Sequence, residues 1–524
     1  MRLTILPRMN NTYSRFSIGF PRVGGIALLA LVVLSTPVLA DEDAGPAQGC
    51  QKGSQDEGFF QRLKESYKSH LEWNGPDPQA PVPSVVGGAE NPESNPPWPY
   101  ASWNIGGSEL IGVDNMYYNA FMDALYCGPG GQKLKDSRFT VYGWVEPGAN
   151  LSTSHTRFNY ATGTGGNYPA AYSYEPNTVQ VDQVALYFER TPDEVQRDHF
   201  DWGGRFTALY GTDYKYTFAD GILSNQYLKD ERQYGFDPVM YYLDFWFPKI
   251  AEGENIRVGR YISIPDIEAQ LAPNNLTYSH SLLYTFDPYT QTGVVSTTKL
   301  SKNWQLQTEL SAGNDVAPWV KTERHLTPAA CVIWTSNSGK DSLYPCMNGL
   351  NDSDWRWNNV QQSVITWYHK FNSQWHIDTE AWYMWEAHTP NVNNPEGLAA
   401  IAAAYPGIRT GAPGGAQCSS AVAYCYSYEW AFINYINYQF GPRDIVTWRS
   451  DYLDDAKGQR TGFKTRYTEF DLSFTHWVGD AIELRPELRF EHSLDVDAYD
   501  NPTAIPGAGR HSQTMIAADA VVHF

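Results

Sequence analysis

The stretch HSQTMIAADAVVHF (His511–Phe524) ends the chain and decides its fold class. From Thr514 onward every second residue is apolar or small, whereas the alternate positions include Gln513, Asp519 and His523. A segment of about 9 to 11 residues with one face suited to lipid and one suited to water is typical of a strand that crosses a membrane in a β-barrel. If this strand closes a barrel, the other segments must show the same two faces.

The same alternation occurs elsewhere in the chain. In AIELRPELRFEH (481–492) each apolar residue from Ile482 onward is followed by a charged one. Residues 375–385 and 469–474 repeat the pattern, with His376 and Glu380 among the polar positions. A soluble core would have to hide these charges, but a water-filled lumen accepts them directly.

The connections between the predicted strands are sorted by length. Gly479–Asp480 is tight, whereas 314–357 and 387–427 are long. Short periplasmic turns and long extracellular loops are typical of outer-membrane barrels. The sequence therefore predicts an all-β, transmembrane antiparallel β-barrel of about 14 strands, or 16 if Thr277–Pro288 supplies part of another hairpin.

The region before the barrel divides into three predicted parts. Residues 1–40 carry four arginines, an apolar run and a small-residue cleavage site, and this order predicts a signal peptide for export to the bacterial outer membrane. Residues 41–100 predict a periplasmic helix and a Pro-rich linker. Residues 101–138 form a pre-barrel segment, and 139–524 form the barrel. The sequence does not decide whether 41–138 plug the lumen.

The charge of the chain excludes one class of partner. Without the four arginines of the signal, 34 basic side chains face 58 acidic ones. This balance argues against nucleic acid and favours cations near the protein. Solubility of large loops would explain it equally well. The mean hydropathy of −0.46 does not separate a soluble protein from a barrel with a polar interior.

The six cysteines suggest disulfides, because the chain is predicted to be exported. We expect them to act as structural staples in loops. The sequence contains no CxxC or CxxCH motif, so haem attachment and thiol redox chemistry are poorly supported. The candidate pairs follow from proximity in the sequence, and the connectivity stays open: Cys331 with Cys346, Cys418 with Cys425, and Cys50 with Cys127.

Four segments resemble the OmpL-like putative beta-barrel porin family of bacterial outer-membrane porins. They are VYGWVEPGANLSTS (Val141–Ser154), IRVGRYISIPDIEAQLAPNNLTYSHSLLYTFDPYTQTGVV (Ile256–Val295), YLDDAKGQRTG (Tyr452–Gly462) and ELRPELRFEHS (Glu483–Ser493). The resemblance covers most of the chain from about Gly106 onward. These segments are typical of a family rather than of a reaction, so they imply fold and location and leave the solute open.

The resemblance also implies a constriction. Porins of this layout fold an outer loop inward, with acidic groups on the loop facing basic groups on the wall. Here the segment 264–290 would be that loop. The predicted loop residues are Asp266, Glu268, Asn274 and Asn275, and the predicted wall residues are Arg205, Arg257, Arg449, Arg485, Glu487 and Arg489. The alternative is that the arginines pair with neighbours such as Asp451 and Glu491 and only hold strand register.

Three classes of function remain at this point. The first is a passive channel for small hydrophilic solutes that prefers cations and lies in outer-membrane lipid, with a homotrimer left open. The second is a surface adhesin or glycan-binding barrel that uses the long loops. The third is a barrel enzyme, which we disfavour because His280 and Ser281 would point to opposite faces of a strand and no catalytic motif is present. No cofactor and no metal is expected.

Overall fold

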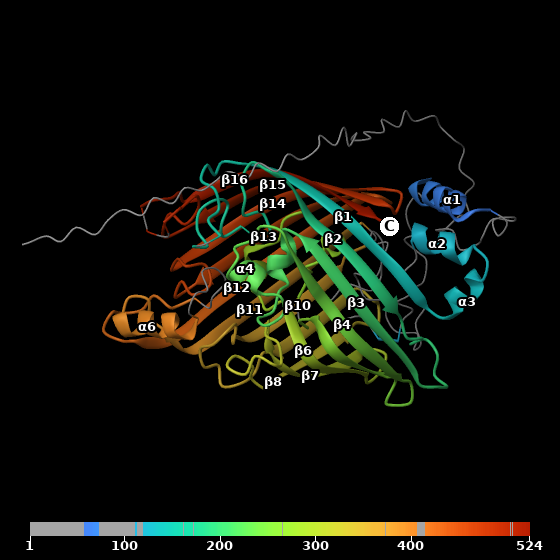
Figure 1. The fold of residues 1–524 in the computed structure, drawn as a ribbon, viewed down its shortest axis with the longest axis horizontal. Coiled ribbons are helices and arrows are strands. Elements are labelled where there is room, and N and C mark those ends of the chain that lie inside the picture. The colour runs from blue at the N-terminus through green and yellow to red at the C-terminus, as the bar shows by residue number, and fades with distance from the viewer. Residues whose placement is uncertain are drawn as a thin grey trace, which may run out of the picture. The chain divides into compact units, whose positions relative to one another are not determined.

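The computed structural model describes residues 57–72, 111–112, 119–160, 162–170, 172–264, 266–372, 374–405, 414–503, 505 and 507–524. Sixteen strands form one closed antiparallel barrel, in which sequence neighbours pair and β1 pairs with β16 (Figure 1). The strands are β1 Phe139–Ser152, β2 Val179–Arg190, β3 Asp201–Gly211, β4 Gly235–Phe247, β5 Glu254–Ile262, β6 Thr290–Lys299, β7 Trp304–Asn314, β8 Thr327–Thr335, β9 Asp341–Asn348, β10 Gln361–Lys370, β11 Trp375–Pro390, β12 Tyr424–Gly441, β13 Asp444–Asp455, β14 Thr465–Val478, β15 Ile482–Ser493 and β16 Ser512–His523.

The strand count corrects the main prediction. About 14 strands is wrong, and the alternative of 16 is confirmed. The two additional strands are β8 and β9, which lie in a segment that the sequence assigned to a long loop. Residues 277–288 supply no strand and belong to the connection between β5 and β6. The alternation of apolar and polar residues does not mark β8, because its inward-facing residues are as apolar as its outward-facing ones. The inward-facing residues are Ala329, Cys331 and Ile333.

The two faces of the closing strands are as predicted. On β15, Leu484, Leu488 and Phe490 are exposed on the outside, and the charged residues between them are buried inside the barrel. The barrel closes where Gly143 on β1 and Phe524 exchange backbone hydrogen bonds of 3.0 and 2.9 Å. The chain's last strand is therefore held by its first.

The ends of the barrel differ. The strands are joined by short turns at one end, which we call the turn end, and by long connections at the other, which we call the loop end. Figure 1 shows α1–α3 beside the C-terminus at the turn end and α6 at the loop end. The helices are α1 Phe59–Glu72, α2 Ala120–Tyr126, α3 Gly131–Asp136, α4 Asn225–Leu228, α5 Leu282–Thr285 and α6 Pro395–Ala404, with 3-10 turns η3 Asp213–Tyr216 and η4 Ala272–Asn274.

A histidine joins the first two helices to the barrel. The ring nitrogens of His70 on α1 lie 2.9 Å from Asp123 on α2 and 2.8 Å from Asp480 in the β14–β15 turn. Burial lowers the pKa of His70, but its bonds to Asp123 and Asp480 outweigh this effect and raise it to about 9. The charged ring therefore donates to both carboxylates at neutral pH. Within the described part of the chain, helices long and apolar enough to cross a membrane are absent.

Two disulfides lie within the described residues. Cys418, in the connection that precedes β12, is joined to Cys425 at the start of β12, which is the pair that the sequence suggested. Cys331 and Cys346 are also joined, but they are directly paired across β8 and β9, so the expectation of a loop staple is wrong for this pair. Cys127 is disulfide-bonded too. Cys50 and the predicted signal peptide lie outside the described residues, and the pairing of Cys50 with Cys127 stays a prediction.

Candidate functional site

The connection between β5 and β6, residues 263–289, lies inside the barrel, and we call it the inward loop. All of its described side chains except Ile267 and Tyr289 are buried. Strands on the far wall hold its backbone: Leu282 N donates to Asp451 on β13 at 2.8 Å, and Ile267 N donates to Glu380 on β11 at 3.0 Å. The inward loop therefore fills part of the lumen.

Local hydrogen bonds shape the inward loop. The Asn275 amide accepts from Ala269 N at 2.9 Å and donates to Ala269 O at 2.7 Å. Asn275 was predicted to line a pore, but these bonds show that it closes a turn of the loop itself. The Ser281 hydroxyl accepts from Tyr284 N at 3.0 Å and so caps α5. The side chain of Asn274, the other predicted asparagine, lies outside the described residues.

One side of the inward loop is held by three fully buried arginines, which we call the arginine side: Arg449 on β13, and Arg485 and Arg489 on β15. They donate to carbonyl and hydroxyl oxygens of the loop, which are obligatory acceptors when buried. The bonds are Arg485 Nη1 to Ala272 O at 2.6 Å and to Asn275 O at 2.8 Å, Arg489 Nη1 to His280 O at 2.7 Å, and Arg449 to Thr277 Oγ1 at 2.8 Å, to Ser279 O at 2.5 Å and to Ser279 Oγ at 2.9 Å.

The arginine side is also paired with wall carboxylates. Glu469 lies 2.6 Å from both Arg449 and Arg489. The other pairs are Arg489 with Glu491 at 2.7 Å, and Arg485 with Glu146 at 3.2 Å and with Asp519. Buried guanidinium groups need such partners, because an unpaired buried charge costs several kcal/mol. The two roles weighed from the sequence are therefore combined, since these arginines both pair across strands and hold the loop.

Glu268 is the loop acid that faces the arginine side. Its carboxylate lies 3.7 Å from Arg449 and accepts from the Tyr435 hydroxyl at 2.6 Å and from Ser281 N at 3.0 Å. Burial raises the pKa of Glu268, and Arg449 partly offsets that rise. The predicted wall residue Glu487 accepts from Ser279 N at 3.0 Å, so it binds loop backbone rather than an arginine of the wall.

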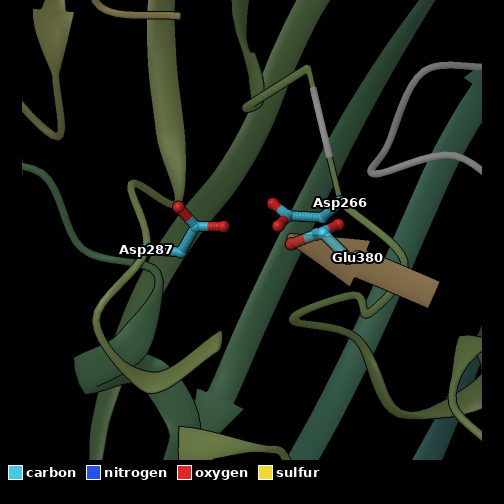
Figure 2. A group of neighbouring side chains, drawn as sticks. All are labelled: Asp266, Asp287 and Glu380. Atoms are coloured by element: carbon cyan, nitrogen blue, oxygen red, sulfur yellow. The ribbon is translucent and has the colours of Figure 1, made fainter. Parts of the chain in front are cut away.

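The other predicted loop acid, Asp266, lies elsewhere. Its carboxylate forms a cluster with Asp287, at the end of the inward loop, and Glu380 on β11, and we call these three residues the acid side (Figure 2). Their exposed fractions are 1%, 1% and 0%. Each offers a carboxylate oxygen within 4.8 Å of the others. None of the three forms an ion pair with any residue that the structure describes.

Few donors reach the acid side. Gln362 donates to Asp287 at 2.5 Å and Ile267 N donates to Glu380 at 3.0 Å, but no donor from outside the cluster reaches either oxygen of Asp266. Burial and the neighbouring Asp287 raise the pKa of Asp266 well above its usual range. Burial likewise raises the pKa of Asp287 to about 7, although Arg460 opposes the rise. Part of the acid side therefore gains its charge close to neutral pH.

The remaining predicted wall arginines are paired near the turn end. Arg205 on β3 donates to Glu189 on β2 at 2.6 Å, and Arg257 on β5 donates to Asp244 on β4 at 2.8 Å. Arg257 also lies 3.9 Å from the ring centroid of Tyr242. These two arginines therefore pair with carboxylates on neighbouring strands, which is the alternative that the sequence analysis left open.

Beyond the inward loop, the connections at the loop end enclose a cavity of about 380 Å³. Aromatic rings dominate its lining, among them Tyr174, Tyr216 and Trp357. Lys215 lies on its wall, 5.1 Å from the ring centroids of Tyr174 and Tyr216, and its ammonium group has no hydrogen-bond or ion-pair partner within the described ranges. Neither Lys215 nor Arg460 was predicted as a site residue, because both lie in connections, outside the strands whose alternation marks the wall.

The geometry around His280 differs from the one assumed for the enzyme hypothesis. His280 and Ser281 lie in the inward loop and not in a strand. The Ser281 hydroxyl donates to Glu268, and His280 Nε2 lies 2.6 Å from Ala269 O. Burial lowers the pKa of His280 well below its usual range, so the ring is neutral. The histidine is thus not placed to activate the serine.

The sequence of the barrel decides the family. Residues 138–524 match the model of a family described as "Putative beta-barrel porin-2, OmpL-like". The chain belongs to this porin family. Its family and closed barrel make it an outer-membrane porin channel, and they point away from catalysis. The chain matches no curated protein.

Solved porins share the barrel architecture at low identity. The outer-membrane channel DcaP of Acinetobacter baumannii is 11% identical, with a TM-score of 0.42, over 74% of this chain and 97% of that one. An anion-selective porin from Comamonas acidovorans is 10% identical, with a TM-score of 0.43, over 74% of this chain and 99% of that one. OmpT of Vibrio cholerae, in trimer form, is 8% identical, with a TM-score of 0.42 and the same two coverages as the Comamonas porin. This level of similarity carries no argument about the solute of the present porin.

Proposed function

We propose that this porin forms a water-filled channel for passive diffusion of small hydrophilic solutes and that the channel prefers cations. One observation supports the preference. The three arginines of the arginine side are each paired with wall carboxylates, whereas the acid side has no cationic partner within the described residues. The excess charge beside the inward loop is therefore negative, and rings of acidic groups favour cations in a pore.

The sequence suggested that the acidic residues of the inward loop lie opposite the arginines of the wall, and the structure differs from this arrangement. Only Glu268 opposes an arginine of the arginine side, at 3.7 Å from Arg449. Asp266 lies in the acid side instead, together with Glu380 of β11. The buried carboxylates beside the loop are therefore paired with arginines on the arginine side and not on the acid side.

Planar-bilayer recording of the purified protein tests the proposal. In a KCl gradient at pH 8 the reversal potential should have the sign of a cation-preferring channel. A panel of sugars and amino acids should reduce the current according to size. A reversal potential with the sign of an anion preference would refute the selectivity, and the absence of any conductance from inserted protein would refute the channel.

The adhesin or glycan-binding alternative has one supporting observation, the aromatic cavity at the loop end. Faces of rings such as Tyr174 and Trp357 suit stacking against sugar rings, and Asn358 and Gln459 supply hydrogen-bonding groups. Tryptophan fluorescence during titration with oligosaccharides would detect such binding. Saturable binding that is lost in Tyr174→Ala, with conductance unchanged, would favour this function. We expect Tyr174→Phe, the matched control, to keep the ring face and the binding.

A further inference from the structure

We propose that Asp266, Asp287 and Glu380 bind a hard divalent cation, and that Ca²⁺ fits the acid side better than Mg²⁺. The three carboxylates come from the two ends of the inward loop and from β11. In Figure 2 both oxygens of Asp266 and one oxygen of Glu380 lie on the side that faces Asp287. A cation in this gap would tie the loop to β11, two strands from the β13 strand that carries Arg449. Binding of the cation does not depend on whether the barrel conducts ions.

The burial of unpartnered oxygens is a second observation, separate from the clustering. Asp266 is only 1% exposed, and neither of its oxygens accepts a hydrogen bond from outside the acid side. One oxygen of Asp287 and one of Glu380 are also without a partner. Buried carboxylates normally accept hydrogen bonds or coordinate metals, because their transfer from water is otherwise costly. A buried cluster of carboxylates with so few donors from outside is therefore suited to a ligand that supplies positive charge.

The spacing fits one hard cation. The ligand oxygens all lie within 4.8 Å of one another. Ca²⁺ binds oxygens at about 2.3–2.6 Å, so oxygens on opposite sides of the ion lie about 4.6–5.2 Å apart. Mg²⁺ requires near-octahedral geometry and keeps several waters. A site whose side chains are 0–1% exposed leaves little room for those waters, which favours Ca²⁺.

The surroundings are consistent with the charge of such an ion. Arg460 donates to the carbonyl oxygen of Phe286, the residue before Asp287, and to Asn358 at 2.8 Å. It lies 3.8 Å from Glu429 as well, so it is not committed to the acid side. Phe286 also lines the aromatic cavity at the loop end, so the chain passes from the cavity wall to the site within one residue. The sequence carried no signal for the site, because its three ligands follow no motif spacing.

Calorimetry on the full-length mature protein in detergent, stripped with EDTA, tests the site. Titration with CaCl₂ should show one saturable site with a Kd below about 1 mM, as in extracellular Ca²⁺ modules. Asp266→Asn and Glu380→Gln should each weaken binding roughly tenfold or more. MgCl₂ should bind more weakly to the wild type than CaCl₂.

Asp471→Asn is the matched control. Asp471 on β14 is also buried and both of its oxygens lack a hydrogen-bond partner, but it is directly paired across strands with Arg449 and Arg489. Its substitution should leave Ca²⁺ affinity unchanged. The proposal would be overturned if the wild type showed no saturable Ca²⁺ binding, or if Asp266→Asn and Glu380→Gln bound Ca²⁺ as tightly as the wild type does. It would also be overturned if the wild type bound Mg²⁺ as tightly as Ca²⁺.

A second measurement uses the wild-type protein alone, so that a folding defect of a variant cannot affect the result. Crystals of the wild-type protein soaked in SrCl₂, with Sr²⁺ replacing Ca²⁺, should give an anomalous peak between the three carboxylates. A soaked crystal without that peak would overturn the proposal. Because both experiments measure binding, a channel that proves anion-selective or silent would leave their outcome interpretable.

Discussion

The two sides of the inward loop are equally buried but differ in how their charges are satisfied. On the arginine side, Arg449, Arg485 and Arg489 each have carboxylate partners and also bind loop oxygens. On the acid side, Asp266 receives no hydrogen bond from outside the cluster, and no arginine within the described residues forms an ion pair with any of the three carboxylates. A satisfied network stabilises a loop, whereas unsatisfied buried charge is kept where a ligand or a function uses it. The difference suggests that one side holds the loop and the other meets ions.

Arg449→Met should break the arginine side and have the largest effect. It removes four donor contacts to the loop and to Glu469, and it leaves the fully buried Glu469 short of one partner. We expect the free energy of unfolding to fall by about 3–5 kcal/mol. The released loop should increase single-channel conductance. Urea unfolding monitored by electrophoretic mobility, together with bilayer recording, measures the two effects.

The control for Arg449→Met is Arg466→Met. Arg466 pairs with Asp495 at 2.7 Å, but both side chains are exposed. Exposed pairs contribute little to stability, so neither unfolding nor conductance should change. Wild-type behaviour of Arg449→Met would show that the arginine side does not hold the loop.

The double variant Asp266→Asn, Glu380→Gln should remove the charge of the acid side with little change of shape. A buried charge acts on a permeating ion from a distance, so each charge contributes at most about 1 kcal/mol, or about fivefold. The K⁺ over Cl⁻ permeability ratio at pH 8 in EDTA should fall accordingly. Reversal potentials measure the ratio. An unchanged ratio would place the selectivity elsewhere in the pore.

Raising the pH from 6 to 8 should strengthen the cation preference of the wild type. Asp287 has a pKa of about 7, so its negative charge forms over this interval. The charged or titrating groups around it are Asp266, Glu380, Asp315 and Arg460. The variant Asp287→Asn should show a weaker pH dependence. A cation preference that grows as the pH falls would contradict the assignment.

The smallest effect is expected from a balanced pair near the turn end. The double variant Arg257→Gln, Asp244→Asn removes one positive and one negative charge that lie 2.8 Å apart. The net charge of the lumen does not change, so the reversal potential should hardly shift. If the reversal potential shifted as much as in the acid-side double variant, charges near the turn end would control selectivity whether or not they are paired.

The sequence predicted the strands well where their two faces differ and poorly where they do not. In β15 the alternation of apolar and charged residues marks both faces, and the structure has the strand at Ile482–Ser493. In β8 both faces are apolar, so the strand was taken for loop. Among the site residues, the arginines of the wall were identified as candidates, but Asp287 and the unpaired charge of Asp266 were not.

The sequence by itself determined the barrel, its closure by the last strand and the porin family, because alternation along a strand is a local property of neighbouring residues. Only the tertiary structure decided what lies beside the inward loop. Arg449 and the Ser279 carbonyl that it binds are 170 residues apart. Glu380 meets Asp266 from β11, a strand that does not flank the inward loop. Contacts of this kind depend on the path of the loop through the closed barrel, and no local pattern in the sequence encodes that path.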